Sequence, residues 1–158
     1  MYKKKHYFLL EGEVNPENAS AALLFYKKKI LLQKRDNKKN IFYPGYYSFF
    51  GGGKKNKESY LSCIKREIYE EINIKVKMKD FKFLCKNMLD FSPIKKNKVY
   101  RYYYVKTLST LEFKKIKLNE GKNLQLFEIH NLLKSSTKIA PYDAFVLWLY
   151  AYKQKNYK

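Results

Sequence analysis

The sequence predicts a single α/β or α+β domain in which several short strands are combined with two substantial helices. Three observations predict this class. Short apolar runs bounded by lysines, glycines and Pro-Gly turns are typical of strands. One stretch in the middle of the chain has apolar residues at helical spacing, and a second helical pattern follows Pro141. The 158 residues fit one domain, residues 1–158, and no repeat or flexible linker divides them.

Two apolar segments near the start, residues 20–26 and 29–33, are predicted to be paired strands joined by a tight turn at the lysines between them. A polar and aromatic stretch with a turn signal at Pro44-Gly45 follows. The chain then reaches three consecutive glycines, residues 51–53. Because glycine is a poor strand former, we expect a permissive loop there.

Residues 58–72 carry the clearest helical pattern, because they contain no Pro or Gly and their apolar residues form one stripe. Asn73 stands where a helix commonly ends on a residue in the left-handed conformation. Residues 74–78 then alternate between apolar residues and lysine, which predicts a strand. The stripe that predicts the core face of the helix consists of Leu61, Ile64, Ile68 and Ile72.

The second half of the chain predicts three more strands and a C-terminal helix. Residues 81–89 and 98–106 are strand-like and flank a turn at Ser92-Pro93, and residues 124–129 are a further short candidate. Pro141 followed by an acidic residue marks a helix start. Four large apolar residues fall on one face of that helix: Phe145, Trp148, Leu149 and Tyr152.

The composition describes a folded, strongly basic protein. Lys and Arg number 34 against 14 Asp and Glu, so the formal charge is +20, while 46% of the residues are hydrophobic and 18% aromatic, which excludes disorder for most of the chain. Three of the basic residues are arginine, namely Arg35, Arg66 and Arg101. Two interpretations of the lysines remain open. One is the codon bias of an A/T-rich genome, and the other is attraction to phosphate-rich partners.

Other composition features narrow the class further. Cys63 and Cys85 are too few for a disulfide-stapled domain or a four-cysteine zinc site, and we expect them to be packed thiols. His6 and His130 stand outside any recognisable catalytic spacing. The start of the chain lacks the hydrophobic stretch of a signal peptide, and no apolar run approaches the ~20 residues that span a bilayer. We therefore expect a cytoplasmic protein without membrane association; the oligomeric state stays open.

The helical segment 58–72 carries the strongest chemical pattern. Glu67, Glu70 and Glu71 share one side of the helix, because they are three and four residues apart. Carboxylates at these spacings repel one another, and their oxygens are the hard ligands that Mg²⁺ or Mn²⁺ prefers. Between Glu58 and Glu71 four acids face two basic residues, so this segment is a small acidic island in a basic chain.

Arg66 and Glu58 frame the acidic island. Arg66 follows Glu58 by two helical turns, within reach of that carboxylate or of its neighbours. The glycines lie just before the helix, where the backbone could approach a ligand closely. A glycine loop alone is weak evidence, but combined with Arg-Glu-x-x-Glu-Glu at a fixed distance it indicates a ligand site.

Taken together, residues 52–74 resemble the signature of the Nudix hydrolases. Gly52, Glu58, Arg66-Glu67, Glu70-Glu71 and an aliphatic residue at 74 stand at the spacing of that motif. One signature position departs from the motif, because Asn73 replaces the usual glycine. A second departure lies in the loop before Glu58, where lysines replace the acidic residue and glycine that are common there. The resemblance implies a Nudix-like α/β/α sandwich with a mixed sheet across the whole chain.

The resemblance also implies Mg²⁺- or Mn²⁺-dependent hydrolysis of a pyrophosphate bond in a nucleoside diphosphate linked to another group. By similarity, Glu67, Glu71 and Glu70 are the candidate metal ligands, with a main-chain carbonyl at Gly51 or Gly52. Glu70 is also a candidate for handling the attacking water. In many relatives a glutamate from a later loop acts as base, and Glu120 is the candidate here. Glu58 and Arg66 would be the supporting pair.

The substrate stays open on sequence grounds. Candidates are a nucleoside triphosphate, a nucleotide sugar or a dinucleoside polyphosphate. The 5′ end of an RNA is an alternative, for which the tyrosine-rich run 100–104 would offer stacking faces, although alternate residues of a strand face the core. A non-catalytic nucleotide-binding module on the same fold is a third hypothesis. The aromatic residues that could wall a nucleotide pocket are Phe42, Tyr43, Tyr46, Tyr47 and Phe49.

Overall fold

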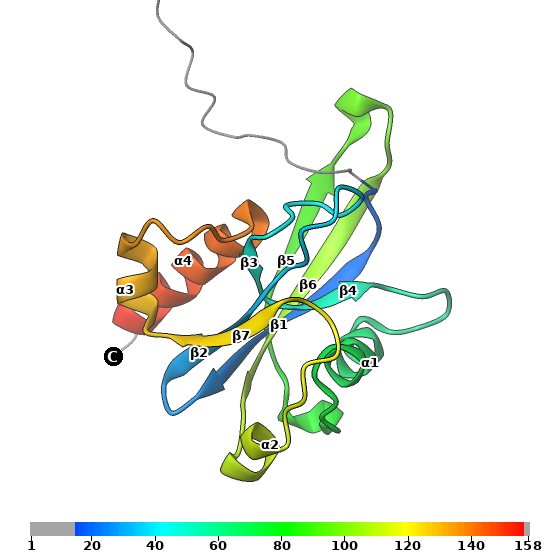
Figure 1. Cartoon of the computed structure of the whole chain (residues 1–158). Coiled ribbons are helices and arrows are strands. Elements are labelled where there is room, and N and C mark those ends of the chain that lie inside the picture. The colour runs from blue at the N-terminus through cyan, green and yellow to red at the C-terminus, as the bar shows by residue number, and fades with distance from the viewer. Residues whose placement is uncertain (1–14, 157–158) are drawn as a thin grey trace, which may run out of the picture.

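One mixed sheet with helices on both faces forms the molecule (Figure 1). The computed structural model describes residues 15–156, so His6 lies outside the described part. Within it, β1 (Ala19–Tyr26) lies at the centre of the sheet, parallel to β6 (Lys98–Thr107) and antiparallel to β2 (Lys29–Lys34). The predicted mixed sheet is confirmed.

The other strands extend this centre. The pair β5–β6 is a long hairpin that projects beyond the rest of the sheet (green in Figure 1), with a 3-10 turn at its tip, Ser92–Ile94. β4 pairs with β1, while β3 and β7 both pair with β2. Their bounds are β3 (Tyr47–Ser48), β4 (Phe50–Gly53), β5 (Lys82–Asp90) and β7 (Asn123–Phe127). A short helix, α2 (Thr110–Lys114), lies between β6 and β7.

The turn between β1 and β2 is tight, as predicted. Lys27 and Lys28 both have positive φ, 46° and 64°. Positive φ at both central residues is the geometry whose twist matches that of the flanking strands in a two-residue hairpin. The turn therefore sets the pairing in which Tyr26 lies opposite Lys29.

Helix α1 (Tyr60–Ile72) covers one face of the sheet. It begins after Ser59, whose hydroxyl accepts a hydrogen bond from the Ser62 backbone at 3.0 Å, so Glu58 precedes the helix rather than starting it. Asn73 ends it with φ 55°, the left-handed conformation expected there. The isoleucines of the predicted stripe are fully buried against β1 and β4; they are Ile64, Ile68 and Ile72.

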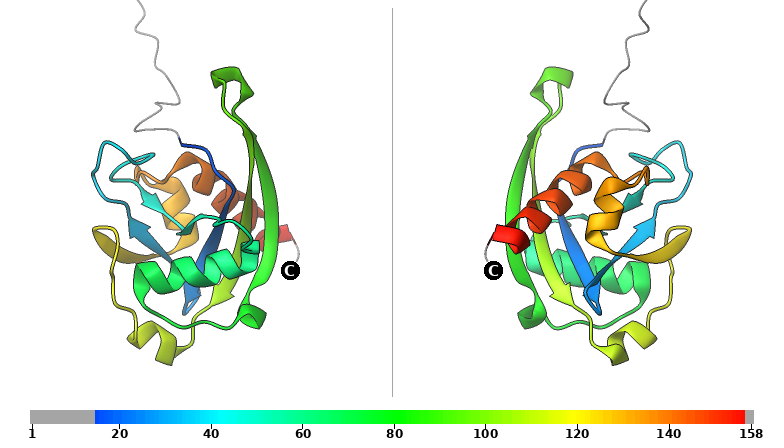
Figure 2. Two further views of the ribbon diagram at one scale, coloured as in Figure 1. Left: turned by 90° about the vertical axis from the view of Figure 1, so that its right-hand side faces the viewer. Right: turned by 90° about the vertical axis from the view of Figure 1, so that its left-hand side faces the viewer.

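Helices α3 (Ile129–Lys134) and α4 (Pro141–Asn156) cover the opposite face, as the two views of Figure 2 show. α4 begins at Pro141, as predicted, and buries Val146 and Leu147 against the sheet. The aromatic face noted in the sequence is the exposed one. Phe145, Trp148 and Tyr152 are each more than half exposed, and Leu149 is half-buried. No helix among residues 15–156 is long and apolar enough to cross a bilayer.

The prediction of a strand at residues 74–78 is wrong. The segment buries Ile74 and Val76 in the core cluster that α1 shares with the sheet, while its lysines are exposed. It takes part in none of the described strand pairings and runs into a 3-10 helix, Met78–Asp80. Alternating burial against a helix end produces the same sequence pattern as a strand.

The expectation of a free loop at the three glycines is also wrong, because they belong to β4 and pair with β1. Gly51 has φ 135°, and a β-carbon there would lie 2.1 Å from the Ser20 carbonyl oxygen. Since only glycine tolerates this backbone and this contact, the glycines permit the close pairing of β4 with β1.

Candidate active site

A pocket of about 370 Å³ opens at the end of the sheet where β1 begins. Both faces of the sheet contribute to its wall. From the α1 side come Glu67 and Glu71, and Glu120 reaches it from the loop before β7. The strand β4 supplies the glycine backbone, so the pocket joins the residues that the sequence pattern singled out.

The glycines allow the carboxylates to approach the backbone. A β-carbon on Gly52 would lie 2.6 Å from the nearer Glu67 carboxylate oxygen, so any side chain there would displace Glu67. The Gly52 carbonyl accepts a hydrogen bond from the Cys63 thiol at 3.5 Å. Cys63 is fully buried, and burial raises the pKa of its thiol to about 11, so it is a packed thiol that supports this strand, as predicted.

Glu71 is the most buried carboxylate of the cluster. It accepts hydrogen bonds from the Gln33 amide at 2.5 Å and from the Gly51 backbone at 2.9 Å, and both donors are neutral. Burial raises the pKa of the Glu71 carboxyl to about 8, and the nearby charges of Glu67 and Glu120 act in the same direction. Gathering these carboxyl groups in one buried place therefore disfavours their charged forms unless a cation lies beside them.

Glu67 is held by Arg66. The guanidinium donates to the Glu67 carboxylate, to Glu70 at 2.8 Å and to the Gly53 carbonyl at 2.9 Å. Burial raises the pKa of Glu67, and the Arg66 charge opposes that rise. Arg66 thus connects helix α1 to strand β4.

The expected pairing of Arg66 with Glu58 is present. Both carboxylate oxygens of Glu58 accept from the guanidinium, at 2.9 and 3.0 Å, and Glu58 also accepts from the Lys55 backbone at 3.0 Å. The hydrogen bonds to Arg66 lower the pKa of Glu58. This bidentate pair fixes the guanidinium in one orientation.

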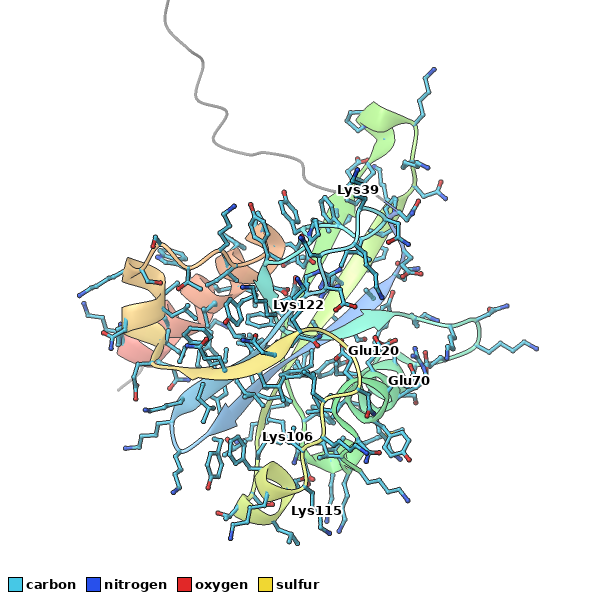
Figure 3. All side chains as sticks on the ribbon, in the orientation of Figure 1. Lys39, Glu70, Lys106, Lys115, Glu120 and Lys122 are labelled. Carbon is cyan, nitrogen blue, oxygen red and sulfur yellow. The ribbon has the colours of Figure 1, made fainter. Side chains whose placement is uncertain are left out.

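Glu70 and Glu120 occupy different positions relative to the pocket. The Glu70 side chain is 41% exposed and pairs with Arg66 and Lys55 on the outside of α1. Glu120 lines the pocket, and its loop is tied to α1 because the backbone of Asn119 donates to the Glu71 carbonyl at 2.8 Å. Figure 3 shows both labelled glutamates beside α1.

The donor set fits a hard divalent cation. Glu67, Glu71 and the Gly52 carbonyl offer oxygen ligands around one pocket, and a cation bound there would stabilise the charged forms of the two buried carboxyls. Within residues 15–156, no three Asp, Glu, His or Cys side chains already stand in a metal-binding arrangement. Arg66 holds Glu67, and Gln33 holds Glu71, so these carboxylates are positioned by the protein rather than gathered into a cage.

The predicted aromatic wall is present only in part. Phe42 lines the pocket, whereas Tyr43 and Phe49 are buried. The Tyr47 hydroxyl donates to the Gln125 side chain of β7. In the tyrosine run of β6, Tyr103 and Tyr104 face opposite sides of the sheet, and both are buried because both faces of this strand are covered.

Several pocket residues were not identified as such from the sequence, among them Arg35, Arg101 and Tyr142. They come from the end of β2, from β6 and from α4, and no local spacing relates them. The one signal available was the rarity of arginine in a lysine-rich chain. His130 lies outside this pocket.

A family model described as "NUDIX domain" matches residues 15–149. The chain belongs to this family. The match includes the glutamates and Arg66 of the pocket region, and membership supports a pyrophosphohydrolase enzyme that acts on phosphoric anhydrides. A search of the curated proteins gave no match.

Solved structures share the fold at low sequence identity. The MutT protein of Methanosarcina mazei Go1 has a TM-score of 0.67 at 18% identity, covering 92% of this chain and 100% of that one. The NUDIX domain of Shewanella oneidensis NrtR, complexed with ADP ribose, scores 0.66 at 15% identity over 97% and 94%. The Ap4A hydrolase of C. elegans scores 0.58 at 18% identity over 87% and 98%.

Proposed function

We propose that this Nudix protein is a Mg²⁺- or Mn²⁺-dependent hydrolase that cleaves a pyrophosphate bond in a nucleoside diphosphate derivative. The observation that carries the proposal is the convergence of Glu67, Glu71 and Glu120 on one pocket beside the glycine strand. Similar structures are named for ADP ribose and Ap4A, and a similar Francisella tularensis enzyme is described with AMP and a Mn ion. These names support a nucleotide substrate class.

Glu67, Glu71 and the Gly52 carbonyl would hold the cation. When bound, a divalent cation neutralises phosphate oxygens and lowers the pKa of water. Pyrophosphate is negatively charged, so carboxylates alone would repel it, and this explains why a cation is required at this end of the pocket.

Neighbouring side chains and backbone groups hold the two proposed metal ligands, Glu67 and Glu71, in place. Arg66 and Glu58 hold Glu67 in place, and Gln33 and the Gly51 backbone hold Glu71. The oxygen of a water molecule attacks one phosphorus, the bridging P–O bond breaks, and a carboxylate accepts the water proton. Glu120 is the proposed acceptor because it lines the pocket, while Glu70 lies outside it.

The test is a turnover panel of nucleoside triphosphates, nucleotide sugars and dinucleoside polyphosphates, with Mg²⁺ and Mn²⁺ and with every product identified. We expect release of phosphate, pyrophosphate or a nucleoside monophosphate from at least one class. Excess EDTA should stop the release. Tight nucleotide binding without any hydrolysis in either metal would instead assign the protein to non-catalytic binding modules.

A further inference from the structure

The chain's three arginines all stand at or beside one pocket. Arg66 holds Glu67 and Glu70, while Arg35 and Arg101 line the pocket itself. The other 31 basic residues are lysines. Since lysine is the usual basic residue of this chain, arginine at these positions indicates a need for its planar, multiply donating guanidinium.

The register of the sheet places Arg101 away from the glutamates. Arg101, Ala19 and Gly53 lie side by side on β6, β1 and β4. With neighbouring strands ~4.8 Å apart, the Arg101 backbone is roughly 10 Å from the glycine strand. Its side chain lies on the α4 face of the sheet, whereas the glutamates of α1 come from the other face.

Packing on α4 fixes the Arg101 guanidinium. It lies 5.0 Å from the centre of the Tyr142 ring and 5.6 Å from that of Tyr103. Its side chain is 15% exposed and faces Asp143, with the closest N···O distance 3.7 Å. A stacked, enclosed guanidinium of this kind is oriented before any ligand arrives.

Several buried polar atoms at this end of the pocket have no hydrogen-bond partner within the described residues. The Nε atoms of Arg35 and Arg101 and one carboxylate oxygen of Asp143 are buried without a hydrogen-bond partner. The other oxygen of Asp143 accepts from the Phe49 backbone at 2.9 Å. A separation of 3.7 Å exceeds that of a charge-assisted hydrogen bond, so Asp143 does not satisfy Arg101. Buried donors without partners cost free energy, which an anionic ligand would recover.

The charges of the pocket are therefore divided between two ends. At one end Glu67, Glu71 and Glu120 are grouped, and exposed Glu17 lies beside Gly53. At the other end two guanidinium groups face the single carboxylate of Asp143, which leaves one positive charge in excess. Phe42 and Tyr142 stack on each other beside it, with their ring centres 5.8 Å apart.

The geometry points to a second anion-binding subsite, in which Arg35 and Arg101 bind a phosphate group of the substrate separate from the pyrophosphate bond that is cleaved. The inference rests on the proposed hydrolase function and narrows its substrate class. The preferred substrate would carry a phosphate monoester on the nucleoside or on the linked group, or a phosphate chain long enough to reach both ends. A guanidinium can bind either form through paired N–H donors.

The first test measures anion binding without turnover. Inorganic pyrophosphate is titrated calorimetrically into metal-free protein in EDTA and 150 mM salt, where the glutamate end repels the anion. Wild-type protein should bind it, and Glu67→Gln should bind at least as tightly. Arg35→Lys and Arg101→Lys keep the charge but lose the guanidinium fork, and each should weaken binding about tenfold.

The matched control is Lys96→Gln, which removes one exposed positive charge from the hairpin beside the pocket. It should bind pyrophosphate like wild type. Folding of each variant is checked by its thermal unfolding, and Arg35→Lys provides an independent readout if Arg101→Lys is unstable. Unchanged affinity in both arginine variants, or no binding to metal-free wild type, would overturn the subsite.

The second test compares paired substrates with Mg²⁺. NADH and NADPH differ by one phosphate monoester, and diadenosine tri- and tetraphosphate differ by one phosphate in the chain. We expect wild-type kcat/KM to favour the extra phosphate at least tenfold in one pair, and the lysine variants to lose that preference. Equal rates in both pairs would overturn the subsite while hydrolysis stands. Absence of hydrolysis would overturn the proposed function. The pyrophosphate titration would then still show whether Arg35 and Arg101 bind an anion.

Discussion

The two ends of the pocket are built in different ways. The glutamate end comes mainly from one continuous segment, in which β4 and α1 are joined by six residues and Arg66 links them. The arginine end is assembled from Arg35, Arg101 and Tyr142, which are far apart in the sequence. The difference indicates that the proposed catalytic end is encoded locally, whereas the proposed anion-binding end depends on the whole fold.

The largest expected effect lies at the glutamate end. Glu67→Gln or Glu71→Gln removes a carboxylate that would hold the cation, and we expect kcat to fall by about a thousandfold or more, because several kcal/mol of stabilisation of developing charge are lost. Steady-state hydrolysis of the best panel substrate measures this. Glu128→Gln, which changes an exposed glutamate paired with Lys29, is the control and should retain activity.

The second prediction separates the two candidates for the catalytic base. Glu120→Gln should lower kcat about a hundredfold or more, as expected for loss of a general base. Glu70→Gln should cost about tenfold or less, because that side chain is exposed and bound to Arg66 and Lys55. The pH–rate profiles of both variants check the assignment. A larger loss in Glu70→Gln would transfer the role to Glu70.

The third prediction tests whether Arg66 acts by positioning. Arg66→Lys cannot reproduce the paired bonds to Glu58 and the bonds to Glu67 and Gly53. We expect kcat to fall about ten- to a hundredfold, as for other residues that orient metal ligands, and the free energy of unfolding to fall by about 1–3 kcal/mol. Urea unfolding and the Mg²⁺ dependence of rate measure the two effects. The neighbouring exposed Lys65→Gln should change neither.

The smallest effect concerns the thiol behind the glycine strand. Because burial raises the pKa of Cys63 to about 11, its thiol stays protonated at pH 8 and should resist alkylation. Burial also raises the pKa of Cys85, but that residue is half-buried and should react sooner. Mass spectrometry of the alkylated protein distinguishes them. Equal labelling would mean that the glycine strand opens more readily than its packing implies.

The sequence was most informative where contacts are local. The helix 60–72, its left-handed end at Asn73 and the Arg66–Glu58 pair all follow from spacing within one segment. The errors arose where tertiary contacts decide. The glycines form a strand because β1 lies against them, and residues 74–78 alternate because their apolar residues pack in the core cluster that α1 shares with the sheet. Arg101 and Tyr142 meet only through the placement of α4 on the sheet.

The strong positive net charge of the protein does not by itself explain which substrate the pocket would bind. Lysines such as Lys39, Lys115 and Lys122 are spread over the surface (Figure 3), where they would favour the approach of any polyanion. The pocket itself combines four glutamates with two arginines. If the proposed subsite holds, selection of a substrate depends on the arrangement of charge in the pocket more than on the total of +20.

The most direct test of the two-ended pocket is a kcat and KM comparison of wild type, Glu67→Gln and Arg101→Lys on the best substrate with Mg²⁺. We expect Glu67→Gln to lose kcat, whereas Arg101→Lys should raise KM about tenfold with kcat largely retained. A wild type without turnover, a Glu67→Gln variant with normal kcat, or an Arg101→Lys variant with normal KM would contradict the two-ended pocket.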